Sequence, residues 1–241
     1  MRAKIYILMI LFGFGLSSCH LNFLNCLEGS GEIVKTDRKL PHFDSIYLNG
    51  GFDLYLIQSD TQKVEVEIDD NLDKYIRTAV NNNELEIIET KSVCTKIKRI
   101  HLYTPNLKKI RINGATDIIG KTPISFNYLE INASGASSMR MEEFNCENLK
   151  IDLSGAADIR INKGRGGNLL IRASGATDIK MKDFFADSCK VEISGAGDIT
   201  LSAETFLLVK VFGAGDVKYK SSKDTKVVKK IMGAGSVTKI E

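Results

Sequence analysis

Five aspartates recur at one position of a repeated motif, and their carboxylates are the groups best placed for chemistry. Each follows a glycine by three residues, in segments such as SGAADI and SGATDI, and serine takes the same position in two further repeats. The aspartates are Asp117, Asp158, Asp178, Asp198 and Asp216, and the serines are Ser138 and Ser236. If equivalent positions stack about 4.8 Å apart, neighbouring carboxylates repel by roughly 0.9 kcal/mol in water. Some other interaction must therefore compensate.

Three interpretations of this aspartate ladder are open: capping of backbone N–H groups at each corner, calcium binding, and glycan binding along the ladder. Calcium prefers six to eight oxygen ligands, whereas each repeat offers one acidic side chain here. Serine can still cap an N–H group but is a poor calcium ligand, so its presence at Ser138 and Ser236 favours capping. We therefore expect a structural, metal-free ladder and no cofactor.

Catalytic side chains are hard to find elsewhere in the chain. His20, His42 and His101 are scattered, and none lies beside a serine, cysteine or aspartate arrangement typical of a triad. Enzymes built on β-helices carry long loops between coils, for which these repeats leave no room. We predict a non-enzymatic protein without catalytic residues. The alternative is a glycan-active protein that binds or cleaves polysaccharide.

The ladder belongs to seven Gly-Ala repeats spaced almost evenly along the chain. Their glycines are Gly114, Gly135, Gly155, Gly175, Gly195, Gly213 and Gly233, at steps of 21, 20, 20, 20, 18 and 20 residues. A fixed period of this length is typical of stacked repeats, in which each unit buries its apolar face on the next. The repeats occupy residues 113–241.

Within a repeat, apolar residues alternate with polar ones on both sides of the glycine. Leu149, Ile151 and Leu153 precede Gly155, and Ile159 follows it in the same phase. A spacing of two indicates strands, with glycine at a corner and the next alanine where the cross-section narrows. The pattern predicts an all-β, single-stranded β-solenoid with coils of about twenty residues.

Residues 1–18 are typical of a bacterial lipoprotein signal peptide. Arg2 and Lys4 precede the apolar stretch 5–16, and Leu16-Ser17-Ser18-Cys19 closes it. Cleavage before Cys19 would leave that cysteine lipidated, on a tether of residues 19–29, and would lower the formal charge from +3 to +1. The alternative is an ordinary secretory peptide. We expect a lipid-anchored envelope protein, in the outer membrane, with no nucleic-acid partner.

Four further cysteines show no metal-binding spacing. Cys146 and Cys189 lie two repeats apart at different offsets, and about 9.6 Å of stacking exceeds disulfide reach. We expect free, mostly buried thiols at Cys26, Cys94, Cys146 and Cys189.

Residues 30–112 predict less regular β-structure. One helical turn is expected at residues 70–76, capped by Asp70. The order SGEIVKTDRKLPHFDSIYLNGGFDLYLIQSD, then NELEI, then IHLYTPNLKKIRINGATDI, then SGA-x-D-I repeats, resembles the GIN-type head domain of adhesins, a bacterial family without an assigned function. The resemblance covers residues 30–241. It implies a right-handed β-helix, a secreted or anchored location and an adhesin label. We expect an adhesin-like binding module whose partners are the membrane, through the lipid anchor, and a surface glycan or protein. The ligand, the membrane face and the oligomeric state stay open.

A lysine run lies near the C-terminus, between Lys218 and Lys230. It predicts a solvated face that blunts an open edge of the stack, with an anionic-surface contact as the alternative.

Overall fold

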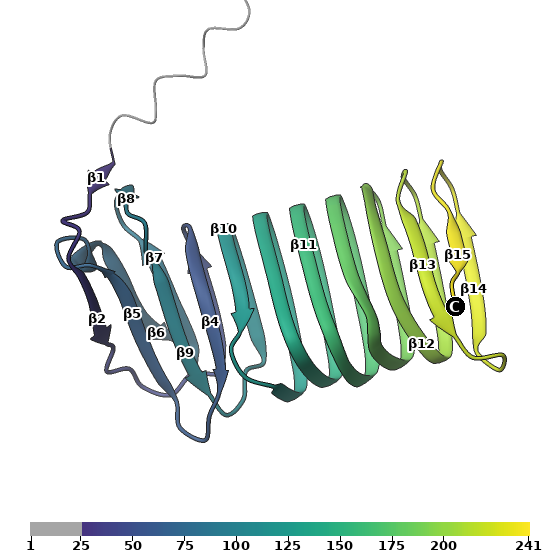
Figure 1. Cartoon of the computed structure of the whole chain (residues 1–241), viewed down its shortest axis with the longest axis horizontal. Helices are drawn as coiled ribbons and strands as arrows, with labels where there is room; N and C mark the ends of the chain where they lie inside the picture. The colour runs from purple at the N-terminus through teal and green to yellow at the C-terminus, as the bar shows by residue number, and fades with distance from the viewer. Residues whose placement is uncertain (1–25) are drawn as a thin grey trace, which may run out of the picture.

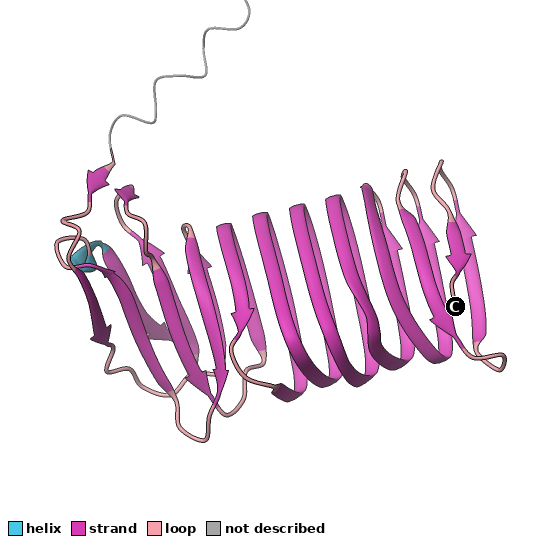
Figure 2. Ribbon diagram, in the orientation of Figure 1, coloured by secondary structure: helices cyan, strands magenta, loops and turns pink. Residues whose placement is uncertain are grey.

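The computed structural model describes residues 26–241 of the chain. The predicted signal peptide, the lipidation residue Cys19 and most of the predicted tether lie outside the described residues. Within residues 26–241 no helix is long and apolar enough to cross a membrane. The described chain is all-β apart from one 3₁₀ turn (Figure 2).

The strands fall into an N-terminal part and a stacked part. The N-terminal part contains β1 (Leu27–Glu28), β2 (Ile33–Asp37), β3 (Ser45–Asn49), β4 (Phe52–Gln58), β5 (Lys63–Asp69), the 3₁₀-helix η1 (Asp73–Tyr75), β6 (Ile76–Asn81), β7 (Glu84–Glu89), β8 (Val93–Cys94) and β9 (Arg99–Thr104). The stacked part contains β10 (Lys109–Gly120), β11 (Ile124–Ile193), β12 (Ala196–Val211), β13 (Asp216–Ser221), β14 (Lys226–Ile231) and β15 (Val237–Lys239). Figure 1 shows β11 bending back repeatedly, so that it supplies several successive passes of the stack.

Equivalent positions of successive repeats lie side by side in parallel register. Gly114 pairs with Gly135, and Asp178 pairs with Asp198. Parallel pairing continues from β12 to β13 and β14, and from β13 to β15. The repeat period of about twenty residues in the sequence is therefore also the separation between paired residues of neighbouring strands.

The predicted inward phase of the strands is confirmed. Ile151 and Ile171 are 0% exposed and Ile193 is 1% exposed, whereas Arg172 lies on the outer surface. The prediction for the corner alanines is wrong, because Ala136, Ala156, Ala176 and Ala196 are all exposed. The residue after the alanine takes the inward place, as Thr177 does at 4% exposure. The positive φ of the preceding glycine turns the chain at this point.

The stack begins earlier than the seven repeats. β3 and β4 pair in parallel with β10, so that Leu48 lies beside Ile112 and Asp53 beside Asp117. β7 and β9 pair in parallel with β3 and β4 in turn, and antiparallel pairs then close this end, β5 with both β2 and β9 and β6 with β7. Residues 45–58 therefore form a further pass of the stack, β7 and β9 lie parallel beside it, and an antiparallel cap closes this end.

The helical turn is shorter than predicted and has a different N-terminus. The 3₁₀-helix covers Asp73–Tyr75, and its N-cap residue is Leu72, which makes no side-chain capping bond. The predicted capping role of Asp70 is therefore wrong. Its Oδ1 instead accepts hydrogen bonds from the Ser30 hydroxyl (2.5 Å) and the Asn71 N–H (2.6 Å). These bonds tie the segment before β2 to the end of β5.

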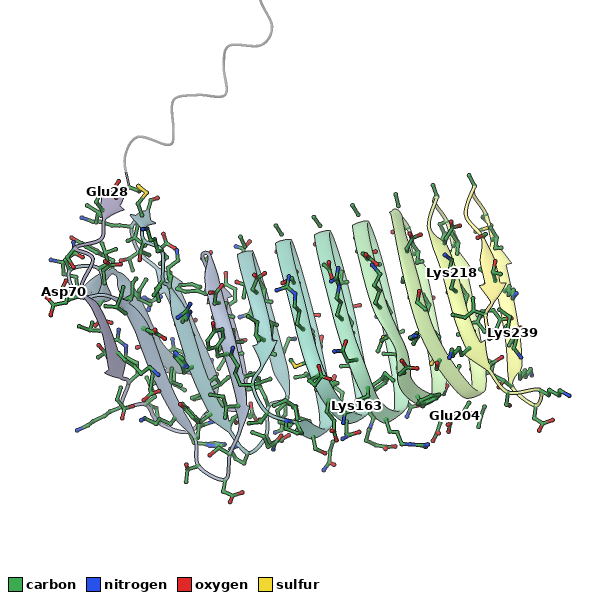
Figure 3. All side chains as sticks on the ribbon, in the orientation of Figure 1. Glu28, Asp70, Lys163, Glu204, Lys218 and Lys239 are labelled. Carbon is green, nitrogen blue, oxygen red and sulfur yellow. A yellow bond between two sulfur atoms is a disulfide. The ribbon has the colours of Figure 1, made fainter. Side chains whose placement is uncertain are left out.

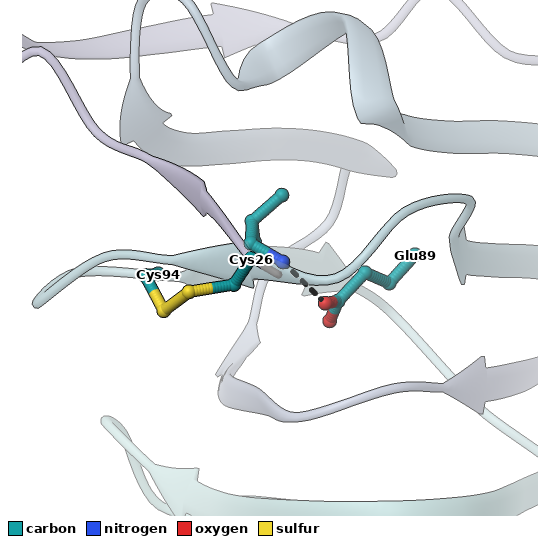
Figure 4. Close-up of a disulfide and its surroundings, with 4 residues drawn as sticks. Cys26, Glu89 and Cys94 are labelled. Atoms are coloured by element: carbon teal, nitrogen blue, oxygen red, sulfur yellow. Dashed lines mark hydrogen bonds between the residues drawn. A yellow bond between two sulfur atoms is a disulfide. The ribbon is translucent and has the colours of Figure 1, made fainter. Parts of the chain in front are cut away.

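Two of the four cysteines differ from the prediction. Cys146 and Cys189 are buried free thiols as expected, but Cys26 and Cys94 form a disulfide (Figure 4). The reason is that β1 returns to lie parallel to β8, which brings the two Cα atoms to 5.5 Å. Glu89 Oε1 holds the start of β8 by accepting the Val93 N–H at 3.1 Å. The bond joins residues 68 apart, so it attaches the start of the described chain to the cap.

Candidate functional site

The glycine corners form one long edge of the stack, which is the upper edge in Figure 1. A Cβ atom on Gly114, Gly135, Gly155 or Gly175 would clash with the carbonyl oxygen of the glycine in the preceding pass. The same four glycines have φ between +114° and +130°. Glycine is therefore required for two reasons, the close approach of the backbones and the left-handed turn. β1 and β8, the second of which contains the disulfide residue Cys94, lie at this same edge, at the N-terminal end (Figure 1).

Two shallow grooves flank the glycine edge and run across several repeats. The first has a volume of about 760 Å³ and is lined by residues that precede the glycines, from Tyr47 and Arg111 at one end to Phe212 at the other. The second has a volume of about 930 Å³ and is lined by residues that follow the glycines, including the exposed alanines and the aspartate ladder. Lys96 and Lys98 line its N-terminal end. Both grooves are open along their length, unlike a deep substrate pocket.

Ion pairs order the floor of the first groove. Arg172 lies 3.5 Å from an oxygen of Asp152 and 3.6 Å from one of Glu192, so it bridges the repeats on either side. The chain of pairs continues through Lys150, Glu130 and Lys210. Burial alone would raise the pKa of Glu130, but hydrogen bonds from Asn132 and Lys150 and the charge of Lys109 outweigh it and lower the pKa to about 2. These side chains hold each other, which leaves a rigid polar surface.

Tyr47 and Phe212 add aromatic surface to the first groove. The Arg111 guanidinium lies 4.5 Å from the centre of the Tyr47 ring, and its Nε donates to Glu84 at 2.8 Å. Phe212 is 45% exposed. A column of serines lies between them, and Ser134 and Ser174 donate to backbone carbonyls of the preceding repeat. Sequence analysis missed this groove, although the repeated residue before each glycine marks it.

The aspartate ladder follows the second groove, and Asp53 extends it by one pass. The predicted capping of each aspartate's own corner is wrong among the described residues, since the hydrogen bonds cross to the next repeat. Asp117 Oδ1 accepts the Ser138 hydroxyl at 2.5 Å, and Asp216 Oδ1 accepts both the hydroxyl (2.7 Å) and the N–H (2.8 Å) of Ser236. The two serines therefore donate to aspartates. This explains how serine at these positions relieves the repulsion between carboxylates.

Two further aspartates of the ladder, Asp158 and Asp178, pair with basic side chains of their own strand. Asp158 Oδ2 lies 3.0 Å from Arg160, and Asp178 Oδ2 lies 2.6 Å from Lys180. The second oxygen of each carboxylate is enclosed and accepts no hydrogen bond. The aspartate side chains are 36% and 40% exposed, so each pair contributes roughly 0.2 to 1 kcal/mol to stability.

Metal binding receives no geometric support from the ladder. Within the described residues, the one group of three ligand atoms within 4.8 Å of one another belongs to Cys26, Glu28 and Cys94, and the two cysteines are already bonded to each other. The ladder therefore offers carboxylates singly along the groove. A calcium ion would need several of them to converge.

Among the described residues, His42 and His101 form no hydrogen bond with a serine or cysteine side chain. His101 Nε2 lies 2.6 Å from Glu67 and the ring packs edge-on against Tyr55, so this side chain links β9 to β5 and β4. His42 lies before β3, and His20 lies outside the described residues. The buried thiols are protected, because burial raises the pKa of Cys146 to about 11 and that of Cys189 to about 12.

Comparison with known proteins supplies a family. The model of the family described as "putative auto-transporter adhesin, head GIN domain" matches residues 42–222. No curated protein matches the chain.

Several solved structures share the fold. A protein described as a putative adhesin from Bacteroides fragilis superposes with a TM-score of 0.84 at 24% identity, covering 89% of this chain and 100% of the other. A second putative adhesin, from Parabacteroides merdae, gives 0.71 at 19% identity, with 90% and 100% covered. A protein described as a putative lipid binding protein, from Parabacteroides distasonis, gives 0.67 at 22% identity, with 90% and 100% covered.

Proposed function

Because the chain belongs to the family of the auto-transporter adhesin head GIN domain, we propose that it is a non-enzymatic, adhesin-like binding module of the cell envelope. In this proposal the module is a right-handed β-solenoid, held on the outer membrane by a lipid on Cys19. It binds its ligand, a surface glycan or protein, along the stack. Family membership by itself identifies no ligand.

Support for the solenoid comes from the register. Successive repeats pair in parallel at nearly constant steps, as coils of a solenoid would, and each pairs with its neighbours only. The right-handed sense is taken from the family.

The observation that carries the binding function is the pair of open grooves beside the glycine edge. They extend across several repeats of a rigid scaffold, and their walls are ordered by ion pairs and backbone hydrogen bonds. A surface of this shape suits an extended ligand that lies along it, and it lacks the enclosed pocket that most catalytic sites need.

Location outside the cytoplasm is supported by two features. A disulfide between Cys26 and Cys94 fits an oxidising compartment, where such bonds persist. The family consists of adhesin-like domains, which are extracellular or associated with the envelope. The lipid anchor rests on the basic start, the short apolar stretch and the residues before Cys19.

The second candidate is a glycan-active protein, and the spacing of the ladder favours it. Carboxylates in adjacent passes are about 4.8 Å apart along the stack, close to the roughly 5 to 5.5 Å typical of retaining glycosidases. Against it, Asp158 and Asp178 are each paired with a basic side chain. A general acid or a nucleophile must be free to reach the substrate.

Incubating the chain from His20 onward with a panel of immobilised polysaccharides and surface proteins separates the two candidates. We expect saturable retention on at least one of them without new reducing ends. Tyr47→Ala, which removes the aromatic end of the first groove, should weaken retention about tenfold, by the loss of one stacking contact. Tyr128→Ala, an exposed tyrosine outside both grooves, is the matched control. Release of reducing ends would replace the binding module with a glycan-cleaving enzyme.

A further inference from the structure

The last repeat, formed by β14 and β15, is the exposed end of the stack, at the right of Figure 1. β14 pairs with β12 and β15 pairs with β13, and within residues 26–241 no strand covers their other side. At the opposite end the antiparallel cap covers the first pass. The two ends of the molecule therefore differ: this one ends in parallel strands of the repeat, whereas the other ends in the antiparallel edge strands β2 and β6.

Lysines occupy inward positions of this last repeat. Lys229 pairs with Val209, which is 0% exposed, and Lys239 pairs with Tyr219, which is 5% exposed. Lys229 Nζ donates to the Val237 carbonyl at 2.8 Å and lies 4.9 Å from the centre of the Tyr219 ring. A second copy or further repeat stacked here would bury both ammonium groups, which have carbonyl partners but no carboxylate partner among the described residues. The open edge is therefore blunted against strand addition.

Apolar side chains gather at the same end. Val228 is 39% exposed, Ile231 43% and Met232 51%. In the preceding repeat, Phe212 is 45% exposed. These four are half of the eight large apolar side chains that are exposed among the described residues. Val228 and Met232 lie on the outer face of the sheet, on the same strand and corner as Lys226 and Lys230.

Charge is distributed unevenly between this end and the rest of the stack. Residues 216–241 contain seven lysines and three acidic side chains, a formal charge of +4. Residues 26–215 contain 24 basic and 27 acidic side chains, a formal charge of −3. Figure 3 shows Lys218 and Lys239 at this end of the molecule. The electrostatic field around residues 216–241 is thus positive, whereas residues 26–215 carry a small negative charge. A positive end of this kind suits an anionic partner.

We propose that this end of the stack binds the surface of an anionic lipid bilayer. The C-terminal end surface consists of Val228, Ile231, Met232, Lys226 and Lys230. Its lysines would contact anionic headgroups, and its apolar side chains would enter the interfacial region, the combination by which peripheral proteins bind membranes. An anionic polysaccharide would use the lysines and leave the apolar side chains in water, so a bilayer accounts for more of the surface. The proposal gives the adhesin-like module a partner and is independent of lipidation at Cys19.

Sedimentation with lipid vesicles tests the proposal, using the chain from His20 onward, which lacks Cys19 and keeps every described residue. We expect binding to vesicles of phosphatidylcholine with phosphatidylglycerol and little binding to phosphatidylcholine alone. Raising the salt concentration to about 1 M should abolish vesicle binding, because the Debye length then falls to about 3 Å. Each lysine near an anionic leaflet contributes about a factor of five, so Lys226→Gln with Lys230→Gln should weaken binding about 25-fold. Val228→Ser with Met232→Ser should weaken it about tenfold.

Controls are available on the body of the stack. Lys163 and Lys182 have side chains 60% and 61% exposed, and Lys163→Gln with Lys182→Gln should leave vesicle binding unchanged. Every variant should keep the melting temperature of the parent chain, which separates binding from folding.

Four results would overturn the proposal. One is equal binding to neutral and anionic vesicles, and another is an equal loss in the control variant. The third is tight binding of soluble heparin that Val228→Ser with Met232→Ser leaves unchanged, which would identify an anionic polysaccharide instead. A concentration-dependent dimer lost in the lysine variant would likewise point to a second copy. Since the test chain lacks the anchor and both groove walls stay intact, these results are independent of those that test the proposed function.

Discussion

Gly175→Ala should destabilise the protein by about 4 kcal/mol, the largest effect we expect from removing or adding a single methyl group. The new Cβ would clash with the carbonyl oxygen of Gly155 in the preceding pass, and that oxygen belongs to backbone on which the next repeat is stacked. The φ of +125° adds a second cost, because alanine is strained there. Chemical denaturation of the purified chain measures the loss.

Gly31→Ala is the matched control for this prediction. Gly31 also has a positive φ, +88°, but a Cβ placed on it would have no atom within 4 Å. It should cost about 1 kcal/mol, the conformational cost alone. Equal losses at Gly31 and Gly175 would show that the close approach of the glycine corners contributes nothing.

Ile171→Ala should cost about 3 to 5 kcal/mol. Ile171 is 0% exposed, and its column of inward side chains includes Ile151 and Val191 in the adjacent passes. Parallel stacking on both sides leaves little freedom for the core to close around a cavity.

Arg172→Ala, one residue away on the outer face, should cost about 0.5 kcal/mol. Arg172 forms ion pairs with Asp152 and Glu192, but its side chain is 51% exposed, and solvent screens pairs of this kind. Thermal and denaturant unfolding of both variants measure the difference. Similar losses at Ile171 and Arg172 would show that the inward and outward phases are exchanged.

The stacked part was predictable from sequence because one rule governs it. An inward residue such as Ile171 must pack against its equivalent about twenty residues away. The sequence therefore shows both the two-residue alternation of a strand and the repeat of about twenty residues. The corner was less predictable, since the turn at Gly175 decides which of Ala176 and Thr177 faces inward. That turn depends on the φ of Gly175, which the spacing of residues in the sequence does not determine.

Features that break the repeat were the ones sequence reasoning missed. The Cys26–Cys94 disulfide arises from a return of β1 to β8, a non-repeated contact between segments 68 residues apart. The hydrogen bonds of the ladder depend on which neighbour carries a serine, so Ser138 and Ser236 act as donors to the preceding aspartates.

The inward lysines of the last repeat, in contrast, could have been predicted from the sequence. Aligning KVVKKIM with LLVKVF by the corner glycines places Lys229 beside Val209, a core position. Had each position been compared down its column, the blunted end would have followed from sequence alone.

Detergent phase partitioning of the protein from membranes of the native host, with mapping of its N-terminus, tests the envelope-anchored module most directly. We expect the wild-type protein in the detergent phase, with Cys19 as its acylated first residue, because several acyl chains on one cysteine give durable anchoring. Cys19→Ala should move the protein to the aqueous phase. Unchanged partitioning of Cys19→Ala, or a mature N-terminus at another residue, would contradict the lipid anchor and with it the proposed place of this module on the membrane.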